Sequence, residues 1–152
     1  MVKQFSGLSV GLRTAVAALA LSVLPMGLAT AQARTQAEVN ATLRADTEIF
    51  NGLFVMGIAH GIRDTCPTIE ARMLRANSLA LSLYNRARGM GFSRDEIRAF
   101  LRDDDHKAEL RAIVIDYYNR QGAQVEQPET ICALGLAEIA AGTPSGALLR
   151  AR

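Results

Sequence analysis

The chain lacks most of the residues and motifs around which small enzymes are commonly built. It has two histidines and two cysteines in 152 residues, which excludes a three-histidine zinc site and leaves no Cys-x-x-Cys pair. After residue 33 it contains no Gly-x-Ser-x-Gly segment, and we find no glycine-rich phosphate loop, so nucleophile-elbow and nucleotide-cradle chemistry are not indicated. Aromatic residues make up 5% of the chain, too few for a platform on which bases stack.

The first 33 residues have the three parts of a secretory signal peptide. A cationic start precedes an apolar stretch at residues 15–28, and small residues end the segment. Cleavage after Ala33 and cleavage after Ala31 both fit the small-x-small rule. The apolar stretch is shorter than the roughly 20 residues that span a bilayer, which disfavours a retained anchor. We predict a signal peptide at residues 1–33 and a periplasmic product with no stable membrane anchor after cleavage.

The part of the chain that follows has the size and charge of one neutral domain. Removing residues 1–33 from the 152-residue chain leaves 119 residues, enough for one core and too few for two. The 17 basic side chains include Lys3 and Arg13, so this part carries 15 basic and 15 acidic side chains. A neutral domain gives no support for nucleic-acid binding. We therefore predict a single helical domain at residues 34–152 with no nucleic-acid partner.

The two cysteines, Cys66 and Cys132, are expected to form one disulfide. Paired cysteines persist in exported chains because the periplasm is kept oxidising. Closing the segment between them restricts the unfolded chain by about 4 kcal/mol in the loop-entropy model. A redox-active pair is the alternative, but the chain has neither a Cys-x-x-Cys motif nor a strand-rich frame.

Helical patterns separated by stop signals run through residues 34–152, with no convincing strand alternation. We predict an all-α fold, a small bundle of four to five helices. Capping-box patterns begin at Thr35 and Ser93, Pro128 fits the first turn of a last long helix, and Gly142 ends that helix. Asp103–Asp105 either interrupts a helix or caps the next one.

A central helix is predicted from Ile49 to Ile62, because this stretch is apolar on nearly all sides. Its three glycines, Gly52, Gly57 and Gly61, weaken a helix by propensity, and we expect them to allow close approach of neighbouring helices. After a break at Pro67, Thr68 is expected to cap a second helix that runs to about Arg88.

Near the C-terminus, residues 147–149 are expected to form one last short turn. In the preceding helix, Cys132, Leu136 and Ile139 are expected to share the face that points into the core.

The densest set of potential metal ligands lies at residues 103–109, with three aspartates, His106 and Glu109. Consecutive aspartates point in different directions on a helix, so a solvated helix start explains them better than a metal site. His60 is expected at a core or boundary position. Asp64, Glu70 and Glu138 are candidates for paired carboxylates, although any helical protein of this size offers such pairs. We assign no catalytic, cofactor-binding or metal-binding residue.

Glu138 lies in an apolar helix six residues beyond Cys132, where a buried carboxylate needs a partner. We predict a structural ion pair between Glu138 and Arg72, with Arg75 as the alternative partner.

Four segments together resemble one uncharacterised family. They are Cys66–Met73, Gly91–Ile97, Cys132–Thr143 and Leu148–Arg150. Over about residues 49–150 the chain is similar to a domain-of-unknown-function family of short exported proteins from Rhodobacter-type alphaproteobacteria. The resemblance implies an all-helical periplasmic domain with paired cysteines, and no activity, cofactor or catalytic residue comes with it. It also implies a protein partner on the periplasmic face of a membrane complex.

The leading hypothesis is a non-enzymatic periplasmic accessory or protein-binding module, which presents an arginine-bearing helix face to its partner and needs no cofactor. Two alternatives stay open. The first is a small metal-dependent hydrolase that uses residues 103–109. The second is a helical carrier that binds an apolar ligand between the helix of Phe50 and Phe54 and its neighbours.

Overall fold

The computed structural model describes residues 34–152, and most of these residues are helical. The predicted signal peptide at residues 1–33 lies outside the described residues. The prediction of an all-α fold is confirmed, with six α-helices in the described part where four to five were expected. The helices are α1 (Gln36–Ala45), α2 (Thr47–Thr65), α3 (Met73–Gly89), α4 (Arg94–Arg102), α5 (Asp104–Arg120) and α6 (Pro128–Ala141).

Side-chain caps stabilise the first turns of helices α1, α4 and α5 at residues that the sequence had already indicated. At α1 the Glu38 amide donates to the Thr35 hydroxyl, and the Glu38 carboxylate accepts from the Thr35 amide at 2.8 Å. Ser93 and Glu96 form the same reciprocal pair at the start of α4. Asp103 accepts from the His106 amide at 2.8 Å, so it caps α5 and does not merely interrupt a helix.

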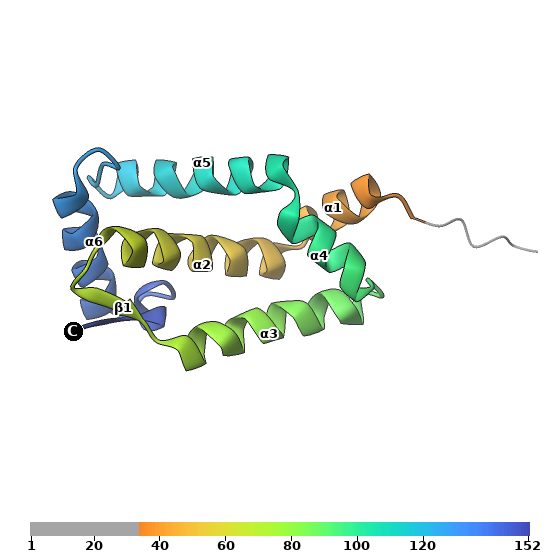
Figure 1. The fold of residues 1–152 in the computed structure, drawn as a ribbon, viewed down its shortest axis with the longest axis horizontal. Coiled ribbons are helices and arrows are strands. Elements are labelled where there is room, and N and C mark those ends of the chain that lie inside the picture. Colours follow the sequence, from red (N-terminus) through yellow and green to blue (C-terminus); the bar gives the residue numbers. More distant parts are fainter. Residues whose placement is uncertain (1–33) are drawn as a thin grey trace, which may run out of the picture. The chain divides into compact units, whose positions relative to one another are not determined.

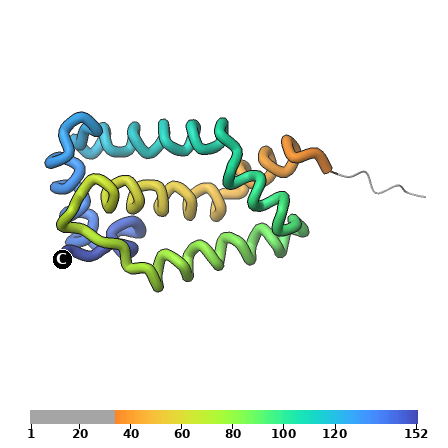
Figure 2. The backbone as a smooth tube through the Cα atoms, in the orientation of Figure 1, coloured from red at the N-terminus to blue at the C-terminus, as the bar shows by residue number. Residues whose placement is uncertain are grey.

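The predicted central helix is confirmed. Helix α2 lies between α3 and α5 (Figure 1) and also contacts α1 and α6. The chain path shows α1 and α4 near one end of α2, while α6 and the C-terminal segment lie near the other end (Figure 2). Within residues 34–152, no helix is both long and apolar enough to cross a membrane.

The glycines of α2 lie where other elements come close, as predicted. A Cβ at Gly52 would lie 2.6 Å from the Leu83 methyl carbons of α3, and one at Gly57 would lie 3.0 Å from Val114 of α5. A Cβ at Gly61 would collide with the Tyr118 hydroxyl of α5. Glycine at these positions therefore allows α3 and α5 to pack against α2.

Two hydrophobic cores lie along α2. The first is near its C-terminal end and comprises Ile58, Ala59, Ile62, Cys66, Ile69, Val114, Tyr118, Ala123, Ile131, Leu134, Leu148 and Leu149. The second is near its N-terminal end and comprises Val39, Leu43, Ile49, Ala87, Phe92, Ile97 and Phe100. Each fully buried large aliphatic side chain contributes about 1.5–3 kcal/mol to stability.

The predicted helix start at Thr68 is wrong. Residues 69–71 form a short strand, β1 (Ile69–Ala71). It pairs antiparallel with a second strand, β2 (Leu149–Ala151), and Glu70 lies opposite Arg150. Helix α3 begins only at Met73. The residue before it, Arg72, donates its amide N–H to the Leu148 carbonyl at 2.7 Å. The C-terminal segment thus satisfies the backbone groups that a helix from Thr68 would have used. It reaches β2 through a one-turn 3₁₀ helix, η1 (Gly146–Leu148), close to the last turn that was predicted.

The buried face of α6 is offset from the predicted one. Leu136 is 48% exposed, whereas Ile131, Leu134, Gly135 and Glu138 are buried. The offset arises because Gly135 lies directly against Ile62 and Ile69, where a Cβ would collide with both side chains.

Candidate functional site

The most apolar hollow lies beside α3, which has only one buried residue, Ala87, in its 17-residue length. The hollow has a volume of about 150 Å³ and opens between α2 and α3. Its walls also include side chains of α1 and α4. The lining residues are Leu43, Ile49, Leu53, Met56, Ala80, Leu83, Tyr84, Ala87, Ile97, Phe100 and Leu101.

A second hollow of about 220 Å³ continues along the same two helices. It shares Met56 and Ala80 with the first and ends among polar groups at His60, Arg63 and Asn77. We call the two hollows together the α2–α3 groove. The groove is apolar where it meets α4 and polar at its other end.

A third hollow, of about 430 Å³, surrounds the first turn of α3. We call it the arginine corner, and it is lined by Ala71, Arg72, Met73, Leu74, Arg75 and Arg150. Arg75 donates to the Ala147 carbonyl at 3.3 Å, and Arg150 pairs with Glu70 at 2.7 Å. The Arg72 Nε atom is buried without a hydrogen-bond partner among residues 34–152. The corner therefore carries more positive charge than its own carboxylate neutralises.

Glu138 is the buried carboxylate of the molecule's C-terminal end, with 5% of its surface exposed. Three hydroxyls, those of Tyr117, Thr143 and Ser145, donate to its two oxygens. Burial by itself raises the pKa of this carboxyl, but the hydrogen bonds from Ser145, Thr143 and Tyr117 outweigh burial, and the net pKa is lowered. Burial and the bond to Glu138 raise the pKa of Tyr117 to about 12. This cluster holds a charged carboxylate and neutral hydroxyls at neutral pH.

The hydroxyl cluster fixes the chain reversal after α6. The Gly146 amide donates to the Thr143 hydroxyl at 3.0 Å, and a Cβ at Gly146 would collide with the Glu138 carbonyl. Ser145 is also buried, at 3% exposed, so its hydroxyl is enclosed together with the carboxylate. Its arrangement positions the turn that leads to β2.

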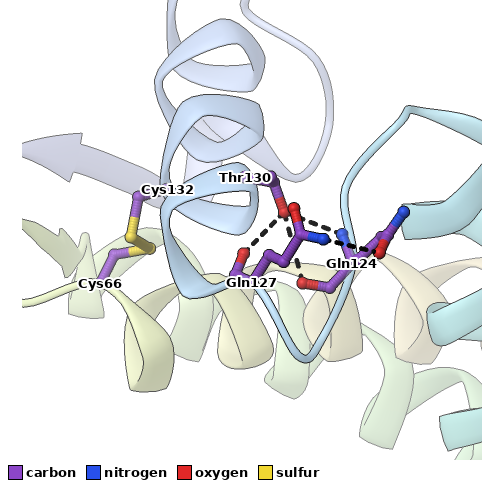
Figure 3. The surroundings of a disulfide bond; sticks show 5 residues. All are labelled: Cys66, Gln124, Gln127, Thr130 and Cys132. Carbon is purple, nitrogen blue, oxygen red and sulfur yellow. Dashed lines mark hydrogen bonds between the residues drawn. A yellow bond between two sulfur atoms is a disulfide. The ribbon is translucent and has the colours of Figure 1, made fainter.

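The predicted disulfide between Cys66 and Cys132 is confirmed, with the two Cα atoms 5.4 Å apart. It joins the end of α2 to the first turns of α6 (Figure 3). In the same picture, Thr130 accepts from the Gln124 amide at 2.8 Å and donates to the Gln127 carbonyl at 2.7 Å. These bonds order the loop that enters α6, so the disulfide joins two locally ordered ends.

Comparison with known protein families matches residues 41–150 to one family model. The chain belongs to DUF5333, a family of unknown function. No curated protein and no solved structure matches it. The match includes the resemblance noted over residues 49–150. It covers the residues that line the α2–α3 groove and the arginine corner, the Glu138 cluster and the disulfide.

The acidic residues 103–105 of this DUF5333 chain lie at the start of α5 and interact with that helix and its neighbours. Asp103 caps α5 and pairs with Arg44 at 3.4 Å, and Asp104 pairs with Lys107 at 2.5 Å. His106 is buried and stacks on Phe100, with ring centroids 4.1 Å apart. Burial and, after it, the nearby Arg44 charge lower the pKa of His106. Among residues 34–152, no three potential ligands of the His, Cys, Asp and Glu types gather closely enough to hold a metal ion.

The other carboxylates considered from the sequence lie in separate surroundings. Asp64 pairs with Arg63 and with His60, and Glu70 pairs with Arg150. The expectation of a core or boundary His60 is wrong, since its side chain is 64% exposed. The buried positions near this end of α2 are Ile58, Ala59 and Ile62, which leaves position 60 towards solvent.

Glu138 has different partners from the predicted one. Its bonds within the described residues come from hydroxyls, and neither Arg72 nor Arg75 forms an ion pair with it there. Sequence reasoning looked for a charged partner and missed Tyr117, Thr143 and Ser145. The available signal was the Thr-Pro-Ser-Gly turn at residues 143–146, which places two hydroxyls just after the helix that carries the carboxylate.

Proposed function

We propose that this DUF5333 protein is a non-enzymatic binding module of the periplasm, and that its α2–α3 groove accepts apolar side chains from a helix of a partner protein. The observation that carries the proposal is the apolar hollow left open between α2 and α3, which is also lined by Leu101 of α4, a leucine that is 49% exposed. Exposed apolar surface of this kind marks interaction sites in soluble proteins. An amphipathic helix lying in an apolar groove is a common form of recognition.

The size of each separate hollow of the groove favours side chains of a partner over a whole small molecule. Pockets for small molecules usually measure about 300–1,000 Å³. The apolar hollow, at about 150 Å³, is smaller than this range, and so is the neighbouring hollow at about 220 Å³. Hollows of this size suit one or two large side chains, as at the centres of protein interfaces.

The arginines in the last turn of α3 support recognition through the groove and not through a charged face of this helix. Arg86 forms a two-bond pair with Asp46, at 2.7 and 2.8 Å, and also pairs with Glu48. Arg88 donates to the Phe92 carbonyl at 2.6 Å. These guanidinium groups are already bonded to groups within the domain. We therefore propose that the apolar groove supplies most of the binding energy for a protein partner.

Site-specific photo-crosslinking from Ala80 tests the proposal in the intact, exported protein. Ala80 is exposed and lines both hollows of the groove. We expect a crosslinker at position 80 to capture one partner whose linked peptide is an amphipathic helix. Ala80→Trp should fill the groove and abolish copurification of that partner. The matched control is Asn85→Trp, an exposed position of α3 outside both hollows, which should retain it.

The proposal fails if Ala80→Trp and Asn85→Trp retain the partner equally, or if position 80 captures no defined protein while the chain is in the periplasm. The test also addresses the predicted export, because cleavage of the signal is read from the mass of the recovered protein. Recovery of subunits of a membrane complex would further support the predicted partner on its periplasmic face. Membership of a group confined to Rhodobacter-type bacteria stays a prediction.

A carrier for an apolar ligand is the second candidate. The observation that favours it is the almost wholly apolar lining of the hollow beside Leu53, Leu83 and Phe100. Mass spectrometry of natively purified protein should then find a bound lipid or quinone-like molecule that Ala80→Trp removes. A clean mass of the polypeptide alone would count against this candidate.

A further inference from the structure

The arginine corner has an excess of positive charge. Arg72, Arg75 and Arg150 line it, and Arg152 lies beside it through its pairing with Glu70 at 3.6 Å. Within residues 34–152, Arg150 and Arg152 both pair with one carboxylate, Glu70, and no ion pair joins Arg72 or Arg75 to a carboxylate. The domain as a whole is neutral by formal charge, so this imbalance is a local feature and predicts an anionic partner for this corner.

Apolar side chains protrude beside these arginines. Leu74 is 88% exposed and Met73 is 56% exposed, both in the first turn of α3. Leu81, at 58% exposed, lies seven residues after Leu74 and therefore two turns along the same face of the helix. A basic and apolar face of this kind is typical of helices that lie in the interface of a membrane.

We propose that the arginine corner, with Leu74 and Leu81 on the adjoining face of α3, docks on an anionic phospholipid surface. The planar guanidinium groups suit the two oxygens of a lipid phosphate, while the protruding leucines enter the acyl boundary beneath the headgroups. A partner protein is the less favoured occupant, because Leu74 is 88% exposed and lies outside the apolar hollow between α2 and α3 that would receive a protein side chain. This inference uses a different surface from the α2–α3 groove and does not rest on the proposed function.

Sedimentation of the disulfide-bonded protein with lipid vesicles tests the inference. We expect binding to vesicles of phosphatidylcholine with phosphatidylglycerol and little binding to phosphatidylcholine alone, and we expect salt to weaken it. Arg75→Gln should lower the partition coefficient about fivefold, the effect of one cationic side chain near an anionic membrane. Leu74→Asn should lower it about tenfold or more, because burial of one leucine is lost.

Two exposed positions on other elements provide controls, Arg102→Gln in α4 and Val125→Asn in the loop before α6. Both should bind as the unchanged protein does. The inference is overturned if phosphatidylglycerol makes no difference, or if the corner variants bind no worse than these controls. It is also overturned if Leu74→Asn binds normally while inorganic phosphate releases the protein, since the corner would then be a site for a free anion. Ala80→Trp should leave vesicle binding unchanged, which separates a failure here from a failure of the groove proposal.

Discussion

At the scale of single residues, Glu138 combines burial with three hydroxyl donors, and this makes it a sensitive position. Glu138→Gln keeps the size of the side chain but replaces one acceptor oxygen with a donor amide. At least one buried hydroxyl then loses its charged acceptor, so we expect the free energy of unfolding in urea to fall by about 2 kcal/mol. Glu126→Gln, in the exposed loop before α6, should change it by less than about 0.5 kcal/mol. Equal effects of the two changes would contradict a stabilising role for the cluster.

His106 gives a pH dependence whose sign follows from its burial. Burial and the charge of Arg44 lower its pKa in the folded state, so the unfolded chain binds this proton more readily. The stability that neutral His106 provides is present above its ordinary pKa of about 6.5 and is lost as the pH falls below that value towards the lowered one. We expect unfolding free energies in urea to decrease from pH 7 to pH 5.5, and to decrease less in His106→Phe, which preserves an aromatic contact with Phe100. An unchanged slope in the variant would refute the assignment to His106.

Residue-level prediction from the sequence succeeded where helix geometry alone fixes the positions of the two partners. The hydroxyl and carboxylate of the Thr35 capping box are three residues apart, and helix geometry alone brings them together. Tyr117 reaches Glu138 across 21 residues and two helices, so its position depends on how α5 packs against α6. Sequence patterns carry no direct record of such packing, which is why the ion pair with Arg72 was expected in its place.

At the scale of elements, the contact between α2 and α5 depends on the absence of a side chain at Gly61. The Tyr118 hydroxyl occupies that space and donates to the Ile58 carbonyl at 2.8 Å. Gly61→Ala gains up to about 1 kcal/mol of helix propensity but displaces this buried hydroxyl. Overpacking costs about 1–3 kcal/mol, so we expect a net loss of stability in thermal or urea unfolding.

The control for this prediction is Gly89→Ala, at the end of α3. A Cβ there meets no atom within 4 Å, and Gly89 is not among the glycines with positive φ. This change should leave stability unchanged or raise it slightly through propensity. If both alanine variants are equally stable, close packing of α2 on α5 is not the reason for glycine at position 61.

Most of the long helices were predictable because they have their own periodic pattern and their own start and stop residues, such as Pro128 and Gly142 for α6. Helix α3, which has no side-chain cap at its start, was predicted to begin too early. The sheet was not predictable in this way. Strand β1 is three residues long, and its partner β2 lies about 80 residues further on, so no local pattern distinguishes it from a helix start. The residues that line the α2–α3 groove were not predictable for a related reason. Whether Ala80 is buried or exposed depends on how α3 packs against α2, and no local pattern records that packing.

At the scale of the whole molecule, α2 contributes to two cores that differ in how they are held together. The core near its N-terminal end, around Phe92 and Phe100, depends on apolar packing among helices α1 to α4. The core near its C-terminal end includes Cys66 of the disulfide and is closed by α6 and the two-stranded sheet. The apolar hollow beside Leu53 and Leu83 adjoins the first of these cores, away from the covalent link.

This division predicts how loss of the disulfide changes the molecule. The bond closes a segment of 66 residues, so the double change Cys66→Ala and Cys132→Ala should lower the free energy of unfolding by about 4 kcal/mol in the loop-entropy model. Without the link, α6 can separate from α2 in a partial opening that leaves the packing of α1 on α4 in place. Hydrogen exchange should therefore accelerate most in α6, β1 and β2, and least in α1 and α4. Uniform acceleration through all helices would show instead that the two cores unfold as one unit.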